Sequence, residues 1–528
     1  MTVDRACGIT TCSAVACGGH THDAAYARVI VDVVTETLDR PLDYSIPDNL
    51  KGCVAVGSLV IVPLGNRKVG GYVVGLSDRA EVPRTRDILS VVGEAPLLDE
   101  TMVRLAMWIR DRYACRACEA IRSMLPAPVR SPKAGRSRRQ DSAPRAGPAP
   151  AHIPAPAPVS SPVPSARVDH TPARVISLTP AQARAVATIQ RALTERSPKP
   201  ILLHGVTASG KTEVYLQAIR TCLDLGRSAI VLVPEISLTP QIVGRFKARF
   251  GEQVAVLHSR LSAGERANEW RRLARGEARV AIGARSCVFA PCHELGLIIL
   301  DEEHEATYKQ EETPRYHARD AAIKRASLEG AAVVLASATP SIESFYKAMQ
   351  GEYEYVELPE RIDARPMPVV DIVDMRREHM DGNRGIFSRR LKDAIIDRLG
   401  RGESIMLFLN RRGYSTFVLC RECGHALKCP NCDVSLTLHS ADGVMRCHWC
   451  GHEEPVPLLC PNCKGHRIGL FGVGTERVEA EVRRVFAGAR VLRMDLDTTR
   501  RKGSHESILS AFSRGEYNVL VGTQMIAK

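Results

Sequence analysis

Hydrophobic and polar residues follow two kinds of pattern along the chain, and the first kind occupies residues 27–76. Short β-type runs, separated by prolines and glycines, read ARVIVDVV, GSLVIVPLG and GGYVVGL. Runs of β-branched residues between turn residues predict a small β-rich domain. In residues 99–125, which follow, Leu105, Trp108 and Ile109 lie near helical spacing, and we expect a helix there.

The second kind of pattern begins after Arg174, where strand-sized apolar runs alternate with charged helical stretches. This alternation predicts parallel sheets that helices cover on both faces, and therefore an α/β fold class. The first series consists of ILLHG, AIVLVP, VAVLH, RVAIG, LGLIILD and AVVLASA. The second series consists of SIMLFLN, RIGLFGVG, RVLRMD and NVLVGT. Two α/β lobes are implied.

Two segments lack such patterns. The stretch from Pro126 to Pro172 holds twelve of the 32 prolines and no aromatic residue, so it cannot bury enough apolar surface to fold. Its basic front end suits either contact with a phosphate backbone or a solvated tether. In chain order we predict an unstructured leader (1–25), a β-rich domain (26–125), a linker (126–173), a first lobe (174–365), a second lobe (366–418 and 465–528) and a cysteine-rich insertion in that second lobe (419–464).

The composition gives the chain a net positive charge and indicates its cellular compartment. The chain has 72 Lys and Arg residues against 59 Asp and Glu residues, a formal net charge of +13. This excess suits a partner rich in phosphate, and a merely solvated basic surface explains it equally well. No apolar run reaches the roughly 18 to 20 residues that span a bilayer, and the N-terminus has no continuous apolar segment of a secretory signal. We therefore expect a cytoplasmic protein with no membrane partner.

A phosphate-binding pattern follows the run ILLH. Gly205–Thr212 reads GVTASGKT, which matches G-x-x-x-x-G-K-[ST] between a strand and a helix. Backbone N–H groups at a helix N-terminus would surround the phosphates, Lys211 would reach the β- and γ-phosphates, and Thr212 would bind Mg²⁺. The alternative is a glycine-rich connector that binds nothing. The predicted ATP-binding residues are Gln182, Gly205, Val206, Thr207, Ala208, Ser209, Gly210, Lys211 and Thr212.

An acidic motif follows the run LGLIILD, as Asp301-Glu302-Glu303-His304. A carboxylate at the C-terminal end of a parallel strand can hold Mg²⁺, while a neighbouring carboxylate orients the attacking water. We assign these roles to Asp301 and Glu302, which complete a catalytic set with Lys211. The alternative is a solvated helix start. Ser337-Ala338-Thr339, after the next strand, suits a sensor between the nucleotide and a nucleic-acid groove.

Eight of the 17 cysteines form four CxxC pairs close together in the chain. Eight thiolates at this spacing in a reducing compartment predict two tetrahedral Cys₄ zinc sites without an open position for catalysis. An iron–sulfur centre is the weaker alternative, because the Gly, Pro and Asn residues around the pairs resemble zinc ribbons. The spacing does not settle which pairs share a metal. The predicted ligands are Cys420, Cys423, Cys429, Cys432, Cys447, Cys450, Cys460 and Cys463.

In order, these motifs resemble those of the PriA (primosomal protein N′) family of bacterial replication-restart DNA helicases, members of superfamily 2. The resemblance runs from about Arg28 to Lys528, apart from the linker. Besides the motifs above, it is carried by VPEISLTPQ, YKQ, RYHARD, ASATPS, FLNRRGY, GVGTE and GTQMIAK. It implies two RecA-like helicase lobes with a zinc-ribbon insertion in the second, preceded by a small β-rich DNA-binding domain.

The resemblance also implies a function and partners. Members of the family use ATP and Mg²⁺ to unwind DNA from 3′ to 5′ at stalled or abandoned replication forks, and they initiate primosome assembly. The implied partners are branched and single-stranded DNA, other primosome proteins, the loader of the replicative helicase and single-stranded-DNA-binding protein, in the cytoplasm at the nucleoid. Two Zn²⁺ are implied, one shared by the outer pairs (Cys420, Cys423, Cys460, Cys463) and one by the inner pairs (Cys429, Cys432, Cys447, Cys450).

DNA-binding residues follow from the same resemblance. In the family the N-terminal domain captures the 3′ end of the nascent leading strand, and RPLDYSIP is similar to that pocket, which places Asp43 and Tyr44 in it. The residues alone allow a turn instead, in which Asp43 caps backbone N–H groups. Tyr308, Tyr316 and His317 match an aromatic-rich loop whose rings contact bases.

Three features depart from the family. The linker occupies the place of the family's winged-helix domain, and Thr313-Pro314 stands where a Gly-Trp pair is usual. The chain ends inside motif V, so we expect an incomplete second lobe without the arginines that reach the γ-phosphate. An ATP-dependent DNA helicase is the leading hypothesis. The alternatives are a fork-binding primosome scaffold that hydrolyses ATP poorly, and a zinc-ribbon nucleic-acid binder.

Overall fold

The computed structural model divides into two units, residues 1–365 and 366–528, and each is described by itself. Nearly all of the predicted leader and linker and Lys528 lie outside the described residues, as do parts of VPEISLTPQ, FLNRRGY and GVGTE. The structure describes residues 24–526 except 36–37, 94, 127–176, 235–239, 259–260, 363–365, 367, 384, 410–416, 421, 440–443, 448, 467, 472–473, 496–497 and 500–503.

A six-stranded sheet forms the N-terminal domain. Its strands are β1 (Tyr26–Val31), β2 (Leu42–Ser45), β3 (Leu59–Leu64), β4 (Arg67–Ser77), β5 (Arg86–Asp87) and β6 (Ser90–Val92). They lie in the order β5-β2-β1-β4-β3-β6. Alternate residues such as Val29, Val31 and Val60 meet in one buried cluster, as the period of a strand requires. The sequence did not predict β2, which lies in RPLDYSIP and pairs with β1.

Two helices follow this sheet where the sequence predicted one. They are α1 (Glu100–Tyr113) and α2 (Ala117–Met124). Asp99 caps α1, because its Oδ1 accepts a hydrogen bond of 2.7 Å from the N–H of Met102. The helix ends at Ala114, whose φ of 47° is left-handed and interrupts the helical hydrogen bonds. Both helices bury apolar residues in the same cluster, so the hydrophobic spacing continues across the break.

The first lobe contains a seven-stranded sheet in which every pair of neighbours is parallel. Its strands are β7 (Ile201–Gly205), β8 (Ser228–Leu232), β9 (Val254–Leu257), β10 (Val280–Gly283), β11 (Leu295–Asp301), β12 (Ala332–Ser337) and β13 (Glu354–Leu358). Their order is β13-β7-β12-β11-β8-β10-β9. All six predicted runs form strands. Edge strand β13 was not predicted, since glutamates interrupt its apolar residues.

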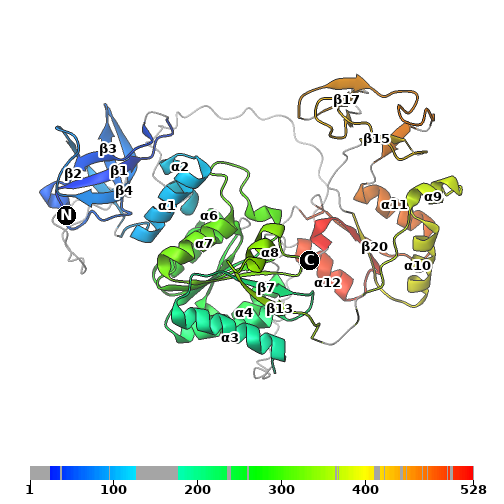
Figure 1. Ribbon diagram of the computed structural model, residues 1–528, viewed down its shortest axis with the longest axis horizontal. Coiled ribbons are helices and arrows are strands. Elements are labelled where there is room, and N and C mark those ends of the chain that lie inside the picture. Colours follow the sequence, from blue (N-terminus) through cyan, green and yellow to red (C-terminus); the bar gives the residue numbers. More distant parts are fainter. Residues whose placement is uncertain are drawn as a thin grey trace, which may run out of the picture. The chain divides into compact units, whose positions relative to one another are not determined.

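Helices cover both faces of this sheet (Figure 1). They are α3 (Pro180–Glu195), α4 (Lys211–Asp224), α5 (Pro240–Phe250), α6 (Ala263–Ala274), α7 (Ala318–Glu329) and α8 (Ile342–Met349), with 3₁₀ turns η4 (Gly251–Gln253), η5 (Arg285–Phe289) and η6 (Ala306–Tyr308). Ile201 and Leu203 pack with α3 and α4, whereas Leu202 belongs to the cluster of α6 and α7. Helices α1 and α2 extend this second cluster, in which Leu105 joins Ala318.

The second unit contains a three-stranded parallel sheet. Its elements are β14 (Ile405–Phe408), β20 (Val491–Met494), β21 (Val519–Gly522), α9 (Met375–Met380), α10 (Arg389–Gly400), α11 (Thr475–Val485), α12 (Ser504–Ser513) and η7 (Gln524–Ile526). The strands lie in the order β14-β21-β20. The predicted α/β fold class is confirmed. No helix in the described part of the chain is long and apolar enough to cross a bilayer.

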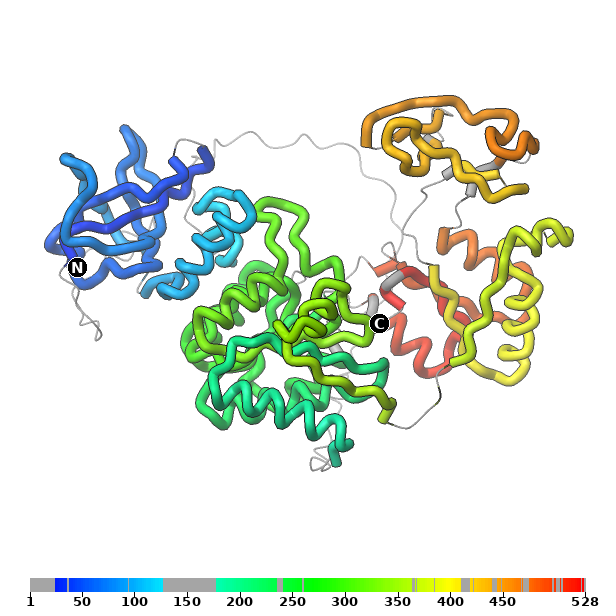
Figure 2. The backbone as a smooth tube through the Cα atoms, viewed as in Figure 1, coloured from blue at the N-terminus to red at the C-terminus, as the bar shows by residue number. Residues whose placement is uncertain are grey.

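The cysteine-rich segment, orange in Figure 2, forms an antiparallel sheet of its own. Its strands are β15 (Phe417–Cys420), β16 (Thr437–His439), β17 (Val444–Arg446), β18 (Glu453–Pro455) and β19 (Ile468–Phe471). The assignment of RIGLFGVG to the second lobe was wrong, because β19 pairs with β15. An apolar run of this length fits either sheet, and the register that sets Cys420 opposite Ile468 is a tertiary feature.

Candidate nucleotide site, nucleic-acid face and metal centres

The loop between β7 and α4 places the predicted phosphate-binding residues at the carboxyl edge of the parallel sheet. Ala208 and Gly210 have φ of 65° and 82°, so the backbone turns sharply there. A Cβ on Gly210 would lie 2.3 Å from Nε2 of Gln182, so close packing as well as φ requires glycine. Lys211 is the first residue of α4, where free N–H groups and the helix dipole attract anions.

The polar atoms of this loop fit a triphosphate. Oγ of Ser209 is buried and has no hydrogen-bond partner among the residues that the structure describes. Nζ of Lys211 donates to the carbonyl of Gly205 at 2.8 Å, so its ammonium group lies at the loop. Gln182 donates to the carbonyl of Ser209 at 2.9 Å and accepts from the N–H of Thr179 at 2.9 Å. Gln182 therefore ties the loop to the start of α3.

Asp301 ends β11, which lies between β12 and β8 in the sheet. Its Oδ1 accepts a hydrogen bond of 2.8 Å from the hydroxyl of Tyr215. Tyr215 lies one helical turn after Lys211, so α4 presents both side chains to the same site. Burial, and secondly the charge of Glu302, raises the pKa of Asp301. A divalent cation would offset this cost. The sequence analysis missed Tyr215, whose spacing from Lys211 was the available clue.

The two glutamates of the acidic motif have different surroundings. Glu302 has a φ of 47°, and its carboxylate lies 3.6 Å from Nδ1 of His304. Glu303 is only 1% exposed and accepts hydrogen bonds from the backbone N–H of Ser341 at 2.6 Å and the hydroxyl of Ser344 at 3.0 Å. The guanidinium of Arg319 lies 3.2 Å from the same carboxylate. Glu303, to which the sequence analysis gave no role, thus joins the acidic motif to α8.

The acidic motif also contacts the predicted sensor directly. Nδ1 of His304 lies 2.7 Å from Oγ of Ser337, at hydrogen-bond distance. The same hydroxyl accepts the N–H of Thr339 at 2.9 Å. A hydrogen bond therefore connects the ends of two adjacent strands, β11 and β12. This geometry suits the predicted sensor role of residues 337–339.

Tyr308 and Tyr316 are core residues, each 1% exposed. The hydroxyl of Tyr308 donates to the carbonyl oxygens of Asp301 and Leu232, at 2.7 and 3.0 Å. The ring of Tyr316 packs against Phe289, with 5.0 Å between centroids. Neither ring is accessible to a DNA base, so the predicted stacking by these two residues does not fit this structure. The loop folds back on the sheet, which buries rings that the sequence could not distinguish from exposed ones.

His317, the third residue of that prediction, is half-buried at the N-cap of α7. Its Nδ1 accepts the N–H of Arg319 at 3.2 Å, and its backbone N–H donates to the hydroxyl of Tyr113 at 3.2 Å. Burial, and secondly the charge of Arg319, lowers the pKa of His317. The structure therefore gives His317 a capping role, and a DNA contact stays a prediction.

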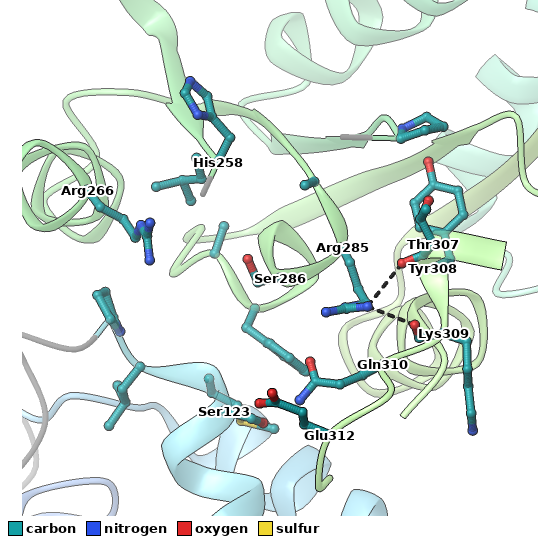
Figure 3. Close-up of a pocket in the computed structure, with 18 of the residues that line it drawn as sticks. Ser123, His258, Arg266, Arg285, Ser286, Thr307, Tyr308, Lys309, Gln310 and Glu312 are labelled. Atoms are coloured by element: carbon teal, nitrogen blue, oxygen red, sulfur yellow. Dashed lines mark hydrogen bonds between the residues drawn. The ribbon is translucent and has the colours of Figure 1, made fainter. Parts of the chain in front are cut away.

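A pocket of about 690 Å³ lies between α2 and the first lobe. Figure 3 shows the side chains of Arg266, from α6, and Arg285, from η5, pointing into it. Arg285 donates to the carbonyls of Thr307 and Lys309, at 3.1 and 2.7 Å, which fixes its guanidinium. Guanidinium groups in a pocket of this size suit the phosphate backbone of a nucleic acid. The remaining lining includes polar groups of both signs, among them His258, Ser286, Gln310, Glu311 and Glu312.

Asp43 and Tyr44 are neighbours on β2 and therefore point to opposite faces of the sheet. Tyr44 is 4% exposed, and its hydroxyl donates to the carbonyl of Pro63 at 3.1 Å, so stacking of its ring on a terminal base does not fit this structure. Oδ2 of Asp43 accepts the N–H of Glu81 at 2.6 Å, and Oδ1 lies 3.9 Å from Nε of Arg28. Asp43 thus lies on a strand and not in a turn, and its contact with a 3′ end stays a prediction.

The eight cysteines of the CxxC pairs form two groups of four. Within each group the ligand atoms lie within 4.8 Å of one another. The distances between Sγ atoms include 3.5 Å for Cys420–Cys463 and 3.5 Å for Cys429–Cys450. Tetrahedral zinc with Zn–S bonds of about 2.3 Å places sulfurs roughly 3.8 Å apart, so both groups fit zinc. The groups are Cys420, Cys423, Cys460 and Cys463, and Cys429, Cys432, Cys447 and Cys450, which is the pairing that the resemblance implied.

The backbone around these sites favours thiolates. A hydrogen bond from the backbone N–H of His425 lowers the pKa of Cys423 to about 6, and one from His452 lowers the pKa of Cys450 to about 6. Gly424 and Gly451 have φ of 75° and 74°, the left-handed conformation of these tight turns. The turns therefore stabilise the thiolate of one cysteine in each group, whereas contacts with neighbouring cysteines raise the pKa of Cys432 and of Cys463 to about 12. A bound cation would offset this cost, because the thiolate is the metal-binding form.

Three family models match separate parts of the chain. The 3′ DNA-binding domain of PriA matches residues 28–126, the DEAD/DEAH box helicase matches residues 179–347, and the Cys-rich region of PriA DNA helicase matches residues 429–455. The second of these matches contains the phosphate loop and the acidic motif at the edge of a parallel sheet, so residues 179–347 form a domain of the DEAD/DEAH box helicase class.

Relatives specify the family. The replication restart protein PriA of Bacillus subtilis is 40% identical, over 95% of this chain and 76% of that protein. The PriA of Treponema pallidum is 36% identical over 96% of this chain and 72% of that protein. The PriA of Synechocystis is 50% identical over 66% of this chain and 43% of that protein. The chain belongs to the PriA family of replication restart proteins, which confirms the resemblance.

Proposed function

We propose that this protein is an ATP-dependent 3′ to 5′ DNA helicase that recognises stalled or abandoned replication forks and initiates primosome assembly for replication restart. One observation carries the proposal. The phosphate loop and Asp301 lie at the carboxyl edge of the sheet against which α1 and α2, the end of the 3′ DNA-binding match, pack in a continuous apolar cluster. A DNA-binding domain and a nucleotide site thus belong to one unit.

The residues of the first lobe would bind and orient the nucleotide. The backbone of 205–212 and Lys211 would hold the phosphates of ATP, and Thr212 and Asp301 would hold Mg²⁺. When bound, Mg²⁺ neutralises charge on the phosphates. Glu302 orients the attacking water, and the hydroxyl of Tyr215 keeps the carboxylate of Asp301 in place.

The pocket between α2 and the first lobe would hold the DNA backbone. Arg266 and Arg285 supply the positive charge there. Arg285 bonds to the carbonyl of Lys309, and the adjacent Tyr308 bonds to the carbonyl of Asp301. Strand binding at Arg285 would therefore act on the backbone that carries the Mg²⁺ ligand, which supports hydrolysis that depends on DNA.

Recognition of a 3′ end would rest on Asp43. A carboxylate repels phosphate and can accept a hydrogen bond from a sugar hydroxyl, so it favours a 3′-hydroxyl end over a phosphorylated one. Asp43→Ala should reduce the preference for forks with a 3′-hydroxyl at the branch over forks with a 3′-phosphate, measured by equilibrium binding. Equal discrimination by the parent and the variant would reduce Asp43 to a structural residue that binds Glu81.

The proposal extends to partners and metals. Family membership supports other primosome proteins, the replicative helicase loader and single-stranded-DNA-binding protein as partners, in the cytoplasm at the nucleoid. Two Zn²⁺ would stabilise the cysteine-rich sheet, since the two groups of four thiolates fit that ion.

The deciding experiment measures ATP hydrolysis by the full chain with and without forked DNA, followed by strand displacement on duplexes with a 3′ or a 5′ single-stranded tail. Hydrolysis that DNA stimulates, with displacement only from the 3′ tail, is the expected result. Displacement from the 5′ tail would overturn the polarity. Tight fork binding without hydrolysis would instead support the alternative function, a fork-binding scaffold that binds ATP but hydrolyses it poorly.

A further inference from the structure

The last residue of α1 bridges the N-terminal domain and the loop that follows the acidic motif. The hydroxyl of Tyr113 donates to Oδ2 of Asp320 at 3.1 Å and accepts the backbone N–H of His317 at 3.2 Å. Nζ of Lys309 lies 4.9 Å from the centroid of the same ring, a cation–π contact. One side chain therefore contacts both ends of the loop 309–317.

The loop 309–317 is closed by its own backbone. Lys309 and His317 form an antiparallel bridge, and the N–H of Gln310 donates to the carbonyl of Tyr316 at 2.9 Å. A displacement at one end of the loop is therefore transmitted to the other. Tyr308 directly precedes Lys309 and donates to the carbonyl of Asp301 at 2.7 Å. The residue that contacts the acidic motif and the residue that contacts Tyr113 are therefore adjacent in the chain.

The contact of α1 with α7 combines an apolar interface with the hydrogen bonds of Tyr113 to Asp320 and His317. Leu105 and Ile109 share a buried cluster with Ala318 and Ala322, and small residues on α7 let the helices pack closely. Apolar contacts alone permit small sliding movements, whereas hydrogen bonds at Asp320 and His317 set one position. Burial raises the pKa of Tyr113 to about 12, so its hydroxyl keeps its proton and its donor role at neutral pH.

We propose that Tyr113 is a positioning residue that makes ATP hydrolysis in the first lobe respond to the DNA end bound by the N-terminal domain. The inference rests on the proposed function and names a route for its regulation. A bound end shifts α1 relative to α7, Tyr113 carries the shift to Lys309 and His317, and Tyr308 carries it to Asp301. Such coupling requires two arrangements of the loop with different rates of hydrolysis.

The test compares two forks on the full chain, one with a 3′-hydroxyl end at the branch and one without a leading strand. The readout is the ratio of the two kcat values for ATP hydrolysis, with fork affinity and melting temperature measured alongside. Tyr113→Phe removes the hydroxyl and retains the ring over Lys309. Asp320→Ala removes the acceptor, whereas Asp320→Asn retains an acceptor oxygen. Tyr355→Phe, which removes a hydroxyl bonded to His204 at 2.8 Å, is the matched control.

The parent should distinguish the two forks, and Tyr113→Phe should change the ratio by about fivefold or more, the scale of coupling between sites. Asp320→Ala should change the ratio in the same direction. Combining it with Tyr113→Phe should add little to the effect of Tyr113→Phe, since the hydrogen bond between Tyr113 and Asp320 is lost in both. Asp320→Asn and Tyr355→Phe should keep the parent's ratio. The rate without DNA should stay near that of the parent in all variants.

The results separate the two proposals. A parent that hydrolyses ATP at the same rate on both forks, or a Tyr113→Phe variant that binds forks normally and keeps the parent's ratio, overturns the coupling and leaves the helicase standing. A change in the kcat ratio in Tyr355→Phe as large as the change in Tyr113→Phe also overturns the proposed coupling. A parent without hydrolysis on any DNA overturns the proposed function itself.

Discussion

The seven-stranded sheet of the first lobe and the five-stranded cysteine-rich sheet depend on different interactions. In the first lobe, residues such as Ile230, Ile299 and Val334 are fully buried, and helices cover both faces. In the described part of the cysteine-rich sheet, the buried cluster comprises Val418, Leu427, Leu436, Met445, Cys429 and Cys447. So small an apolar cluster does not offset the entropy of ordering the segment, and thiolate–metal bonds would supply the remaining stabilisation.

The two regions also differ in where they place charge. The first lobe buries Glu303 and Arg325 and gives each several hydrogen bonds. The ion pairs of the cysteine-rich sheet, such as Lys428 with Asp433, are exposed and contribute little. The comparison teaches that a large apolar core can hold polar groups in fixed positions for chemistry. A small sheet can instead take its rigidity from metal ligands in the turns and at the ends of its strands.

Metal removal should produce the largest difference between the cysteine-rich sheet and the first lobe. The full chain should contain two zinc ions, and chelation should unfold residues 417–471 while the first lobe keeps its protection from proteases, because structural zinc contributes on the order of 10 kcal/mol of folding free energy. Metal analysis and limited proteolysis check this. Cys429→Ser should lose one zinc and the control Cys53→Ser none. Iron in place of zinc, or cleavage of the first lobe on chelation, would contradict the prediction.

Lys211→Ala should abolish the chemistry of the first lobe without disturbing its core. Lys211 supplies the side-chain cation of the phosphate loop, so ATP hydrolysis should fall by about a thousandfold or more, as for other groups that stabilise charge in phosphoryl transfer. Fork binding should stay near that of the parent. The exposed Lys199 offers the control Lys199→Ala, with full activity expected. Hydrolysis by Lys211→Ala at the parent's rate would remove the phosphate loop from the mechanism.

Arg325→Ala tests whether the first lobe depends on its buried charge. Arg325 is fully buried, and its guanidinium binds the carbonyls of Val288 and Ala290 at 2.7 and 2.9 Å and Glu329 at 2.7 Å. Removal takes the guanidinium donors away from these buried acceptors and should lower the free energy of unfolding by about 3 kcal/mol. Denaturant melts measure this. Lys324→Ala, on the same helix and half-buried, should cost far less, and an equal loss would refute a specific role for Arg325.

The smallest expected change in stability concerns Asp301→Asn. Burial raises the pKa of Asp301, so at neutral pH the ionised carboxylate destabilises the folded state. The amide avoids this cost and should raise the free energy of unfolding by about 1 kcal/mol near pH 7, while hydrolysis is lost. As pH falls through the raised pKa of Asp301, the parent gains its proton and the difference should vanish. A variant less stable than the parent at pH 7 would show that the bond from Tyr215 outweighs burial.

Much of the first lobe was predictable because its signals are local. The six apolar runs, the phosphate loop and the acidic motif each lie within a few consecutive residues, and a parallel sheet needs such runs in that order. The residues that the sequence analysis missed make their contacts with residues far away in the sequence. Glu303 looks like Glu302 in the sequence, yet one binds Ser341 inside the protein and the other lies near His304. Nothing local separates these two orientations.

The amino-acid sequence by itself determined the class of chemistry, because a phosphate loop, an acidic strand end and paired cysteines require particular residue types at particular spacings. Only the tertiary structure decided which residues share a site and which aromatic rings are exposed. Tyr44, Tyr308 and Tyr316 matched a DNA-contact pattern and lie in the core, and Ile468–Phe471 joined the cysteine-rich sheet. The physical reason is that burial and strand pairing depend on contacts between distant segments, which spacing along the chain does not encode.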